Sequence, residues 1–414
     1  MVAGRNATIV FMQLFKDFSL SAVTAGFVAV LVGFTSSVAI VFQAAQALHA
    51  TPDMITSWMW ALGIGMGLCT LLPSLWLKKP VMVAWSTPGA AVLASAGVAG
   101  GFTMQEAVGA FMVCAALITV AGWSGWFERV MNRIPVALAS ALLAGVLVRF
   151  GMSGFTAAQT ALPLVLTMLL AYLLSKRWWP RFAVPLTLLV GVAFTAATTG
   201  FSLSGIALEF ATPVWVSPAF SGSALVSMAL PLFIVTMASQ NLPGVAAIQA
   251  TGFGDQRALG GDAGIPVSKI ITLTGVVGLL LAPFGAFALC LSSITAAICM
   301  GPEAHSDPAR RYPAAVFTGV LYLVIGVFGA AVTAVLTAFP KELVAAIAGL
   351  ALLGTIGGAL AAALRHEEHR EAVVITFLVT LSGVVVAGIG SAFWGVVAGA
   401  LALLVQNFRR GRIT

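Results

Sequence analysis

Long apolar runs, separated by short polar or charged stretches, dominate the pattern of residues along this chain. A helix that crosses a bilayer needs about 20 apolar residues, and most of the runs are close to that length. Runs bounded by charge, Gly or Pro predict two groups of spans. The first group is 22–47, 55–77, 81–98, 104–125, 134–151, 157–175 and 182–200. The second group is 224–249, 267–284, 286–301, 312–337, 342–364, 371–388 and 391–408.

The composition indicates lipid as the solvent of the chain. Sixty percent of its 414 residues are hydrophobic and only 8% are charged, whereas soluble domains are about 45–50% apolar and about 25% charged. No soluble fold of this length could cover so much apolar surface with so few charges. The sequence therefore predicts an all-α polytopic membrane protein with 14 transmembrane segments.

The positions of the basic residues support this topology. With the N-terminus in the cytoplasm, all of the 20 Lys and Arg residues except Arg149 and Lys341 fall on the cytoplasmic side. The positive-inside rule then favours an even number of spans in a cytoplasmic (inner) membrane, with both termini cytoplasmic. The net charge of +7 does not indicate a nucleic-acid partner, because the basic residues lie in short separate loops.

The two groups of spans predict an inverted repeat. Seven is an odd number, so the second group begins on the opposite side of the membrane, as in many carriers. The predicted organisation is then a cytoplasmic N-terminal interfacial helix at 1–21, a first repeat at 22–200, an extracytoplasmic connection at 201–223, a second repeat at 224–408 and a cytoplasmic tail at 409–414.

The third span of the first repeat contains a helix-start signal at membrane depth. An extended-looking stretch, 81–85, runs into Ser86, Thr87 and Pro88. A hydroxyl can accept from the unpaired N–H groups of a first turn, and Pro fits the first helical positions. The sequence predicts a short strand followed by a half-helix that begins near Thr87.

The third span of the second repeat has a matching interruption at Ser292, Ser293 and Ile294. Non-helical backbone at membrane depth is tolerated only where protein buries it or a cavity wets it. Two half-helix N-termini that meet there would form a site for an anion. The alternative is two ordinary spans with tolerated Ser, Gly and Pro, but the matched positions favour the site.

Polar side chains inside other spans are further candidates for the site. Gln43 lies in the first span, and Gln240 and Asn241 lie in the eighth. Intramembrane polar groups are costly and often functional. The alternative is that they only join helices by hydrogen bonds. Helix packing is the preferred explanation for the run Thr35–Ser37.

No Asp or Glu lies clearly at the centre of a predicted span, so the carrier of a coupled proton is open. Glu303 and His305, in the charged loop 301–312, are candidates, and a substrate could instead carry its own proton as the neutral acid. The loop fits no metal-ligand spacing, and no metal or cofactor is expected. No enzyme fingerprint occurs in a fitting context, so the chain is expected not to be an enzyme.

Three motifs resemble the benzoate/proton symporters of the BenE family. They are the loop Ala-Ile-Cys-Met-Gly-Pro-Glu-Ala-His-Ser-Asp-Pro-Ala-Arg-Arg-Tyr at 297–312, Trp-Ser-Thr-Pro-Gly at 85–89 and Gln-Asn-Leu-Pro-Gly at 240–244. The resemblance implies a fold shared with uracil permeases and sulfate-type anion carriers. In that fold, segments 1–4 and 8–11 form a core domain, and segments 5–7 and 12–14 form a gate domain. Segments 3 and 10 are each a short strand plus a half-helix.

The resemblance also implies where substrate binds and what it is. Substrate is expected between the two half-helices, beside segments 1 and 8. Uracil permeases offer an acidic residue on segment 8, where this chain has Gln240 and Asn241, which suits an anion better. Trp85, Phe42, Phe287 and Phe233 are candidate ring contacts for an aromatic acid.

The leading hypothesis is a secondary transporter that imports benzoate or a similar aromatic carboxylate with a proton. The alternative is a carrier of the same fold for a nucleobase or an inorganic anion. A channel is disfavoured, because no ring of charged residues lines a pore. Besides substrate, protons and the lipid bilayer, the expected partner is a second copy, paired through the gate domain.

Overall fold

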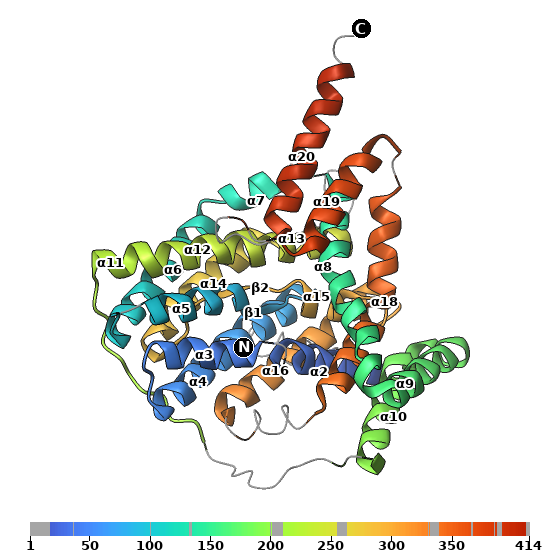
Figure 1. Cartoon of the computed structure of the whole chain (residues 1–414), viewed down its shortest axis with the longest axis horizontal. Helices are drawn as coiled ribbons and strands as arrows, with labels where there is room; N and C mark the ends of the chain where they lie inside the picture. Colours follow the sequence, from blue (N-terminus) through green and yellow to red (C-terminus); the bar gives the residue numbers. More distant parts are fainter. Residues whose placement is uncertain are drawn as a thin grey trace, which may run out of the picture.

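The chain folds into a helical bundle with a short two-stranded sheet inside it, as Figure 1 shows for the computed structural model. The structure describes residues 17–35, 37–99, 101–131, 135–198, 200, 210–254, 263–329, 331, 339–365, 367–384, 386 and 391–410. Most of the predicted N-terminal helix, part of the connection at 201–223 and the end of the C-terminal tail lie outside these described residues.

The described part of the first half of the chain contains nine α-helices, one strand and one 3₁₀ turn. In order they are α2 (Leu20–Thr35), α3 (Val38–Ala47), α4 (Pro52–Leu77), β1 (Val83–Trp85), α5 (Thr87–Ala99), α6 (Met104–Trp123), a short α7 (Trp126–Met131), α8 (Val136–Thr156), α9 (Ala158–Trp178), a 3₁₀ turn η1 (Pro180–Phe182) and α10 (Ala183–Thr198).

The second half contains a long interrupted helix and then a similar order of elements. It begins with α11 (Gly222–Ala224), the π-helical η2 (Leu225–Ala229), α12 (Leu230–Thr236), the π-helical η3 (Met237–Asn241) and α13 (Leu242–Ala250). It continues with α14 (Val267–Leu281), η5 (Ala282–Phe284), β2 (Leu289–Leu291), α15 (Ile294–Met300), η6 (Pro308–Arg310), α16 (Tyr312–Val327), α18 (Lys341–Ala363), η7 (Glu367–His369), α19 (Arg370–Ser382) and α20 (Ser391–Arg410).

The predicted strand and the short helix that follows it are present in both halves of the chain, as β1–α5 and β2–α15. The predicted span at 22–47 is instead broken between α2 and α3. The hydroxyl of Ser37 donates to the carbonyl of Gly33 at 2.7 Å, a local bond that competes with regular helix and bends it. The span at 224–249 carries two π-helical stretches that the apolar pattern did not predict.

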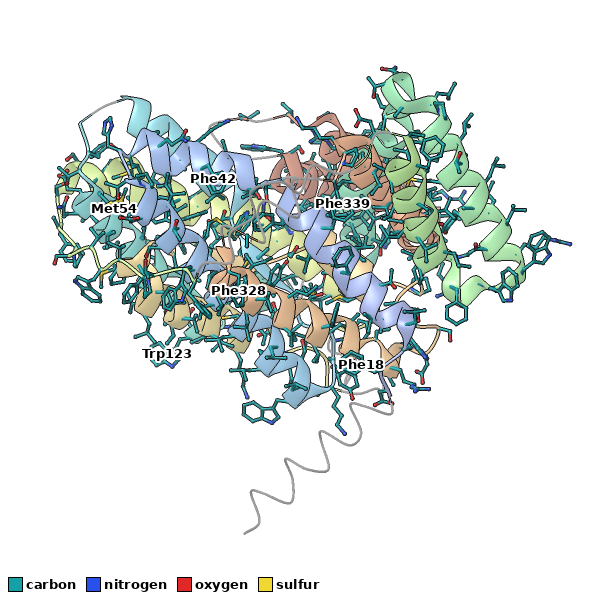
Figure 2. All side chains as sticks on the ribbon, turned by 90° about the horizontal axis from the view of Figure 1, so that it is seen from below. Phe18, Phe42, Met54, Trp123, Phe328 and Phe339 are labelled. Atoms are coloured by element: carbon teal, nitrogen blue, oxygen red, sulfur yellow. The ribbon has the colours of Figure 1, made fainter. Side chains whose placement is uncertain are left out.

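Membrane-crossing character is clear for part of the bundle. Among the described residues, six helices are long and apolar enough to cross a bilayer, or seven if the bent pair Lys341–Gly354 and Ile356–Ala363 is one span. Large apolar side chains also cover the outside, and Trp76 and Trp123 are 89% and 82% exposed. Figure 2 shows Trp123 at the periphery of the bundle. Such a surface suits contact with lipid.

The helices pack into two groups. In the first group, α16 packs along α4, α14 packs along α6, α3 packs on α5 and α15 packs on α2. In the second group, α8 packs against α18 and α19, α9 packs on α10, and α19 packs on α20. Figure 1 shows α8, α9, α10 and α18 gathered on one side of the molecule, with α19 and α20 above them. The two groups meet mainly where α13 contacts α8 and where α2 and α15 contact α18.

Candidate functional site

The two strands pair with each other inside the first helix group. They are antiparallel, with Val83 opposite Leu291 and Trp85 opposite Leu289. Backbone hydrogen bonds continue the pairing at both ends. The N–H of Ser86 donates to the carbonyl of Ala288 at 3.0 Å, and the N–H of Ser292 donates to the carbonyl of Met82 at 3.1 Å. These bonds satisfy backbone groups that would otherwise be unpaired at membrane depth. They also bring the starts of α5 and α15 together.

The start of α5 follows the hydroxyl–Pro signal in the sequence. Ser86 precedes the helix, and its Oγ accepts from the N–H of Gly89 at 3.1 Å and from the hydroxyl of Thr236 at 2.9 Å. Pro88 has no N–H, and the N–H groups of Gly89 and Ala90 both donate to Ser86. The N–H of Thr87 is then the first-turn donor that has no partner among the described residues. α5 therefore offers one backbone donor and the Thr87 hydroxyl.

The start of α15 is built differently. The helix has only seven residues, and the side chain of Ser293 makes no capping bond to it. The hydroxyl of Thr295 donates to the Oγ of Ser292 at 2.7 Å, so the two hydroxyls next to the helix start are bonded to each other. The first-turn N–H groups of α15 are therefore not covered by a side-chain cap.

A small cavity of about 60 Å³ lies where the two helix starts meet. Its aromatic wall is Phe34 and Trp85, whose ring centroids are 5.5 Å apart, together with Tyr322. The indole N–H of Trp85 donates to the Oγ of Ser37 at 2.9 Å, which fixes the ring. The complete lining is Gly33, Phe34, Ser37, Met66, Ala84, Trp85, Thr87, Gln240, Ser292, Ile294, Thr295 and Tyr322.

A larger cavity of about 480 Å³ adjoins the small one and lies between the two helix groups. Both cavities are lined by Ser37, Thr87, Gln240 and Ile294. The larger one is also lined by Pro88 and, from the second helix group, by Val146, Arg149, Ser153, Thr380 and Ser391. A small molecule in the large cavity can therefore reach the start of α5 from between the groups.

Most of the residues predicted for the site line one or both cavities. They are Trp85, Thr87, Pro88, Gln240, Ser292 and Ile294. Gln240 lies in η3, where the π-helical turn widens the helix. Such turns are frequent at functional sites because they change the direction of side chains. The segments that the sequence predicted for the site therefore line these two cavities.

The other predicted residues lie outside the cavity linings. Asn241 is fully buried, and its Oδ1 accepts from the N–H of Leu291 at 2.9 Å, so its amide holds β2 against η3. Ser86 is fully buried between Gly89 and Thr236. Ser293 lines neither cavity, and Gln43 is exposed on α3. Of these four residues, Asn241 and Ser86 therefore support the fold next to the cavities.

Comparisons with known proteins bear on what this site does. Residues 16–405 match the family described as BenE, benzoate membrane transport protein. The chain is 36% identical to the benzoate membrane transport protein of Acinetobacter baylyi over 398 residues, which is 96% of this chain and 98% of that protein. It is 45% identical to the inner membrane protein YdcO of Escherichia coli over 383 residues, which is 92% of this chain and 95% of that protein.

The chain belongs to the BenE family of benzoate membrane transport proteins. These relatives are named as membrane or transport proteins, not as enzymes.

Two solved structures of low sequence identity are also similar. The transmembrane domain of the cyanobacterial bicarbonate transporter BicA has a TM-score of 0.47 and 13% identity, covering 92% of this chain and 97% of that one. SLC26A9 has a TM-score of 0.46 and 12% identity, covering 95% of this chain and 66% of that one.

In this BenE-family chain, several lining residues were missed from the sequence. Ser37 was assigned to helix packing, but it lines both cavities and bonds the indole of Trp85. Phe34 and Tyr322 form the wall that Phe42, Phe287 and Phe233 were expected to provide. Phe287 instead packs with Trp58 and Phe111 in the core. A lone aromatic residue in an apolar run carries no signal of which way it points.

The two proton-coupling candidates lie away from the cavities, near the BenE signature loop. The carboxylate of Glu303 accepts from the Nζ of Lys176 at 2.5 Å and from the hydroxyl of Tyr172 at 3.4 Å. Lys176 and Tyr172 belong to α9, so Glu303 links the loop after α15 to the second helix group. Gly354 of α18 also approaches it, since a Cβ there would lie 2.8 Å from Oε1.

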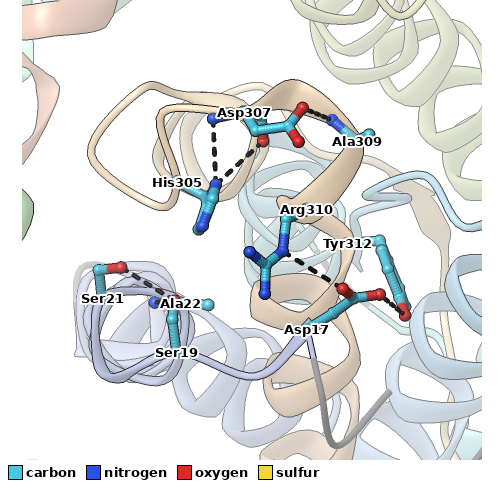
Figure 3. Close-up of polar contacts among 9 residues, drawn as sticks. All are labelled: Asp17, Ser19, Ser21, Ala22, His305, Asp307, Ala309, Arg310 and Tyr312. Atoms are coloured by element: carbon cyan, nitrogen blue, oxygen red, sulfur yellow. Dashed lines mark hydrogen bonds and ion pairs between the residues drawn. The ribbon is translucent and has the colours of Figure 1, made fainter. Parts of the chain in front are cut away.

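His305 has a local role in the same loop. Its Nδ1 accepts from the N–H of Asp307 at 3.0 Å (Figure 3). The next turn is held by an ion pair between Arg310 and Asp17 at 3.2 Å and by a bond from the Tyr312 hydroxyl to Asp17 at 2.9 Å. Asp17 therefore holds the end of this loop through an ion pair and a hydrogen bond.

Proposed function

We propose that this chain is a secondary active transporter that imports benzoate, or a similar aromatic carboxylate, together with a proton. The observation that carries the proposal is the pair of adjoining cavities, which brings polar donors and aromatic rings to one place. The name of the family and of the Acinetobacter baylyi relative supports benzoate as the substrate.

The polar side of the site suits a carboxylate. The N–H of Thr87 at the positive end of α5 favours a negative group, and the uncapped first turn of α15 lies opposite, at Ile294. Gln240 can donate its amide N–H to a carboxylate oxygen without repelling it. The carboxylate is thus recognised without a fixed positive charge in the small cavity.

The aromatic side of the site suits a ring. Phe34, Trp85 and Tyr322 line the small cavity, and offset or edge contacts between rings are favourable by about 0.5–1.5 kcal/mol. A cavity of about 150 Å³ holds a benzene ring, so the small cavity of about 60 Å³ takes only part of such a substrate. The rest of the substrate would extend into the larger cavity, between the helix groups.

The packing supports two inverted repeats of seven segments each, at 22–200 and 224–408. α4 of the first repeat packs on α16 of the second, and α14 of the second packs in the same way on α6 of the first. Likewise α2 packs on the half-helix α15, as α12 packs on the half-helix α5. Such reciprocal pairs are expected if one pseudo-two-fold axis relates the repeats. We assign the first helix group as the core domain and the second as the gate domain.

Alternating access would then arise from movement of the core against the gate. The large cavity separates the two groups at Arg149, Thr380 and Ser391, whereas Glu303 joins them through Lys176 and Tyr172. With both termini in the cytoplasm, the cavity opens to the outside and the Glu303 contact closes the cytoplasmic side. The proposed topology has fourteen segments, and the predicted homodimer through the gate domain stays a prediction.

Glu303 is the better supported of the two proton candidates. Both residues are buried, but the carboxylate of Glu303 contacts the proposed gate through Lys176, whereas the Nδ1 of His305 accepts from the N–H of Asp307 in its own loop. A proton on Glu303 would remove the ion pair with Lys176 and weaken the cytoplasmic contact. Proton binding and inward opening would then be coupled.

The first test is uptake of labelled benzoate by proteoliposomes that contain the purified protein. Uptake is measured with an inward proton gradient and with the gradient collapsed, and empty liposomes control for neutral benzoic acid that crosses lipid unaided. Saturable, gradient-driven uptake that depends on the protein is expected. Uptake no faster than in empty liposomes would overturn benzoate as the substrate, and competition with nucleobases and inorganic anions would then test the alternative carriers.

A single substitution tests the proposed binding site. Gln240→Glu places a negative charge where we expect the carboxylate, and like charges at short range repel by several kcal/mol in a protein interior. We expect the KM for benzoate to rise by about tenfold or more. Gln43→Glu makes the same change on the exposed face of α3 and should leave the KM unchanged. Equal effects of the two substitutions would contradict the proposed site.

A further inference from the structure

One charged side chain in the larger cavity has no role in the function proposed above. Arg149 lies near the end of α8, a helix apolar enough to cross a membrane, and its side chain is exposed in the cavity. With Lys341, it is an exception to the cytoplasmic placement of basic residues. A cation within a membrane-crossing helix is costly, and such residues usually have a function.

The guanidinium of Arg149 lies against the end of α19. It occupies the space beside Gly383, where a Cβ would lie 2.5 Å from Nη1 and 2.8 Å from Cζ. Gly383 ends α19 in the left-handed conformation, at a φ of 71°, where a side chain is also unfavourable. The last carbonyls of a helix carry partial negative charge and stabilise a nearby cation. Both the glycine and the helix end therefore favour this placement.

The positive charge of Arg149 is not neutralised by a carboxylate in the part of the chain that the structure describes. The ion pairs there join Lys176 to Glu303, Arg310 to Asp17 and Arg370 to Glu367. Arg149 lines the same cavity as Thr87, Gln240 and Ile294. An anion that enters between the two helix groups would therefore meet this guanidinium and the start of α5 within one cavity.

We propose that Arg149 is a substrate-binding residue, which captures the carboxylate in the larger cavity before the substrate moves to the start of α5. The inference rests on the proposed function and adds a residue of the gate domain to the site. A guanidinium binds a carboxylate through two parallel N–H bonds, which fixes its orientation as well as its charge. The competing explanation is that Arg149 only fastens α8 to α19.

The test compares Arg149→Gln with Lys341→Gln in the uptake assay. Both changes remove one positive charge from the side that we assign as extracytoplasmic, but Arg149 lines the larger cavity and Lys341 lines neither of the two cavities described. A hydrogen bond to a charged group contributes about 1.5–3 kcal/mol, so Arg149→Gln should raise the KM for benzoate by about 10- to 100-fold. The KM of Arg149→Lys for benzoate should lie between that of Arg149→Gln and that of the wild type. The KM of Lys341→Gln should equal that of the wild type.

Two further measurements separate binding from a structural role. Inhibition by benzamide, a neutral compound of similar shape, should be the same in the wild type and in Arg149→Gln. The KM of the wild type for benzoate should rise with ionic strength, and that of Arg149→Gln should rise much less. Equal loss of benzoate and benzamide binding, or a KM for benzoate that does not change, would overturn the inference.

The outcomes also distinguish this inference from the proposed function. Saturable benzoate uptake by the wild type with an unchanged KM in Arg149→Gln would leave the transporter intact and remove Arg149 from the site. No uptake by the wild type would overturn both. If Arg149→Gln does not fold, Arg149→Lys retains the charge, and a KM equal to that of the wild type would overturn the two-bond recognition.

Discussion

The two ends of the contact between the helix groups differ in how they use charge. At one end, Arg149 faces a cavity of about 480 Å³, and no described carboxylate pairs with it. At the other end, the buried carboxylate of Glu303 is paired with Lys176 and Tyr172, and Gly354 packs against it. One end is suited to attract an anion and the other to exclude it. A carrier that faces one side at a time needs both properties.

The largest expected effect is on the accumulation of benzoate, when the carboxylate of Glu303 is replaced by a neutral amide. Glu303→Gln retains a hydrogen-bonding group but can neither carry the charge nor take up the proton. In the wild type, a gradient of one pH unit can drive about tenfold accumulation per coupled proton. We expect Glu303→Gln to lose this accumulation while it retains exchange of labelled for unlabelled benzoate.

A second carboxylate serves as the control for that experiment. The Oε2 of Glu128 accepts from the N–H of Ser268 at 2.9 Å, within the first helix group. Glu128→Gln should therefore accumulate benzoate like the wild type. Wild-type accumulation by Glu303→Gln would show that the proton travels elsewhere, and His305→Gln would be the next variant to measure.

An intermediate effect is expected in the small cavity, which lies between the two ends. Trp85→Phe removes the bond from the indole N–H to Ser37 but keeps an aromatic ring. The loss of one buried hydrogen bond costs about 1 kcal/mol, so the KM for benzoate should rise about fivefold. Trp60→Phe changes a tryptophan that packs on Phe284 outside the cavities and should have no such effect. An unchanged KM in Trp85→Phe would remove the indole from the substrate site.

The smallest expected effect comes from crowding the Glu303 end. In Gly354→Ala the new methyl group would lie 2.8 Å from the carboxylate of Glu303 and push it away from Lys176. We expect a loss of stability of about 1 kcal/mol, seen as a lower midpoint of thermal unfolding. Gly358→Ala, in the same helix, meets nothing within 4 Å and should not lower the midpoint.

A double-mutant cycle makes the Gly354 experiment specific. If the cost arises from Glu303, it should disappear when Gly354→Ala is combined with Glu303→Ala. A cost that persists in the double variant would locate the strain elsewhere, for example at the ring of Pro302, which lies 3.3 Å from the same Cβ position.

Local signals in the sequence predicted where the two short helices that follow the strands begin. The hydroxyl and Pro at 86–88 predict a helix start, and α5 begins at Thr87. This works because a helix cap depends on neighbours in the chain. Gln240 was recognised because an amide in an apolar run is costly in lipid. The limits of single helices follow some of the predicted runs, as α4 at Pro52–Leu77 follows the run 55–77, whereas the run 22–47 is broken between α2 and α3.

Contacts between residues far apart in the chain could not be predicted from the sequence. Nothing in the sequence around Asn241 indicates that its Oδ1 accepts a hydrogen bond from the N–H of Leu291, 50 residues later. Gln43 and Asn241 look alike as polar residues in apolar runs, yet one is exposed and the other fully buried. Arg149 stood out by its charge alone, and its place in the cavity depends on how α8 packs on α19.

The pairing of β1 with β2 has a mechanical consequence. The two strands come from different halves of the chain, and their ladder extends through Ser86 and Ser292. To separate the two half-helices would break several of these bonds in a place where water cannot replace them. In the proposed transport cycle, the backbone donors at the starts of α5 and α15 would therefore move together as one rigid unit. The binding site would not have to be rebuilt during that movement, so the energy of a proton gradient could be used for the movement itself.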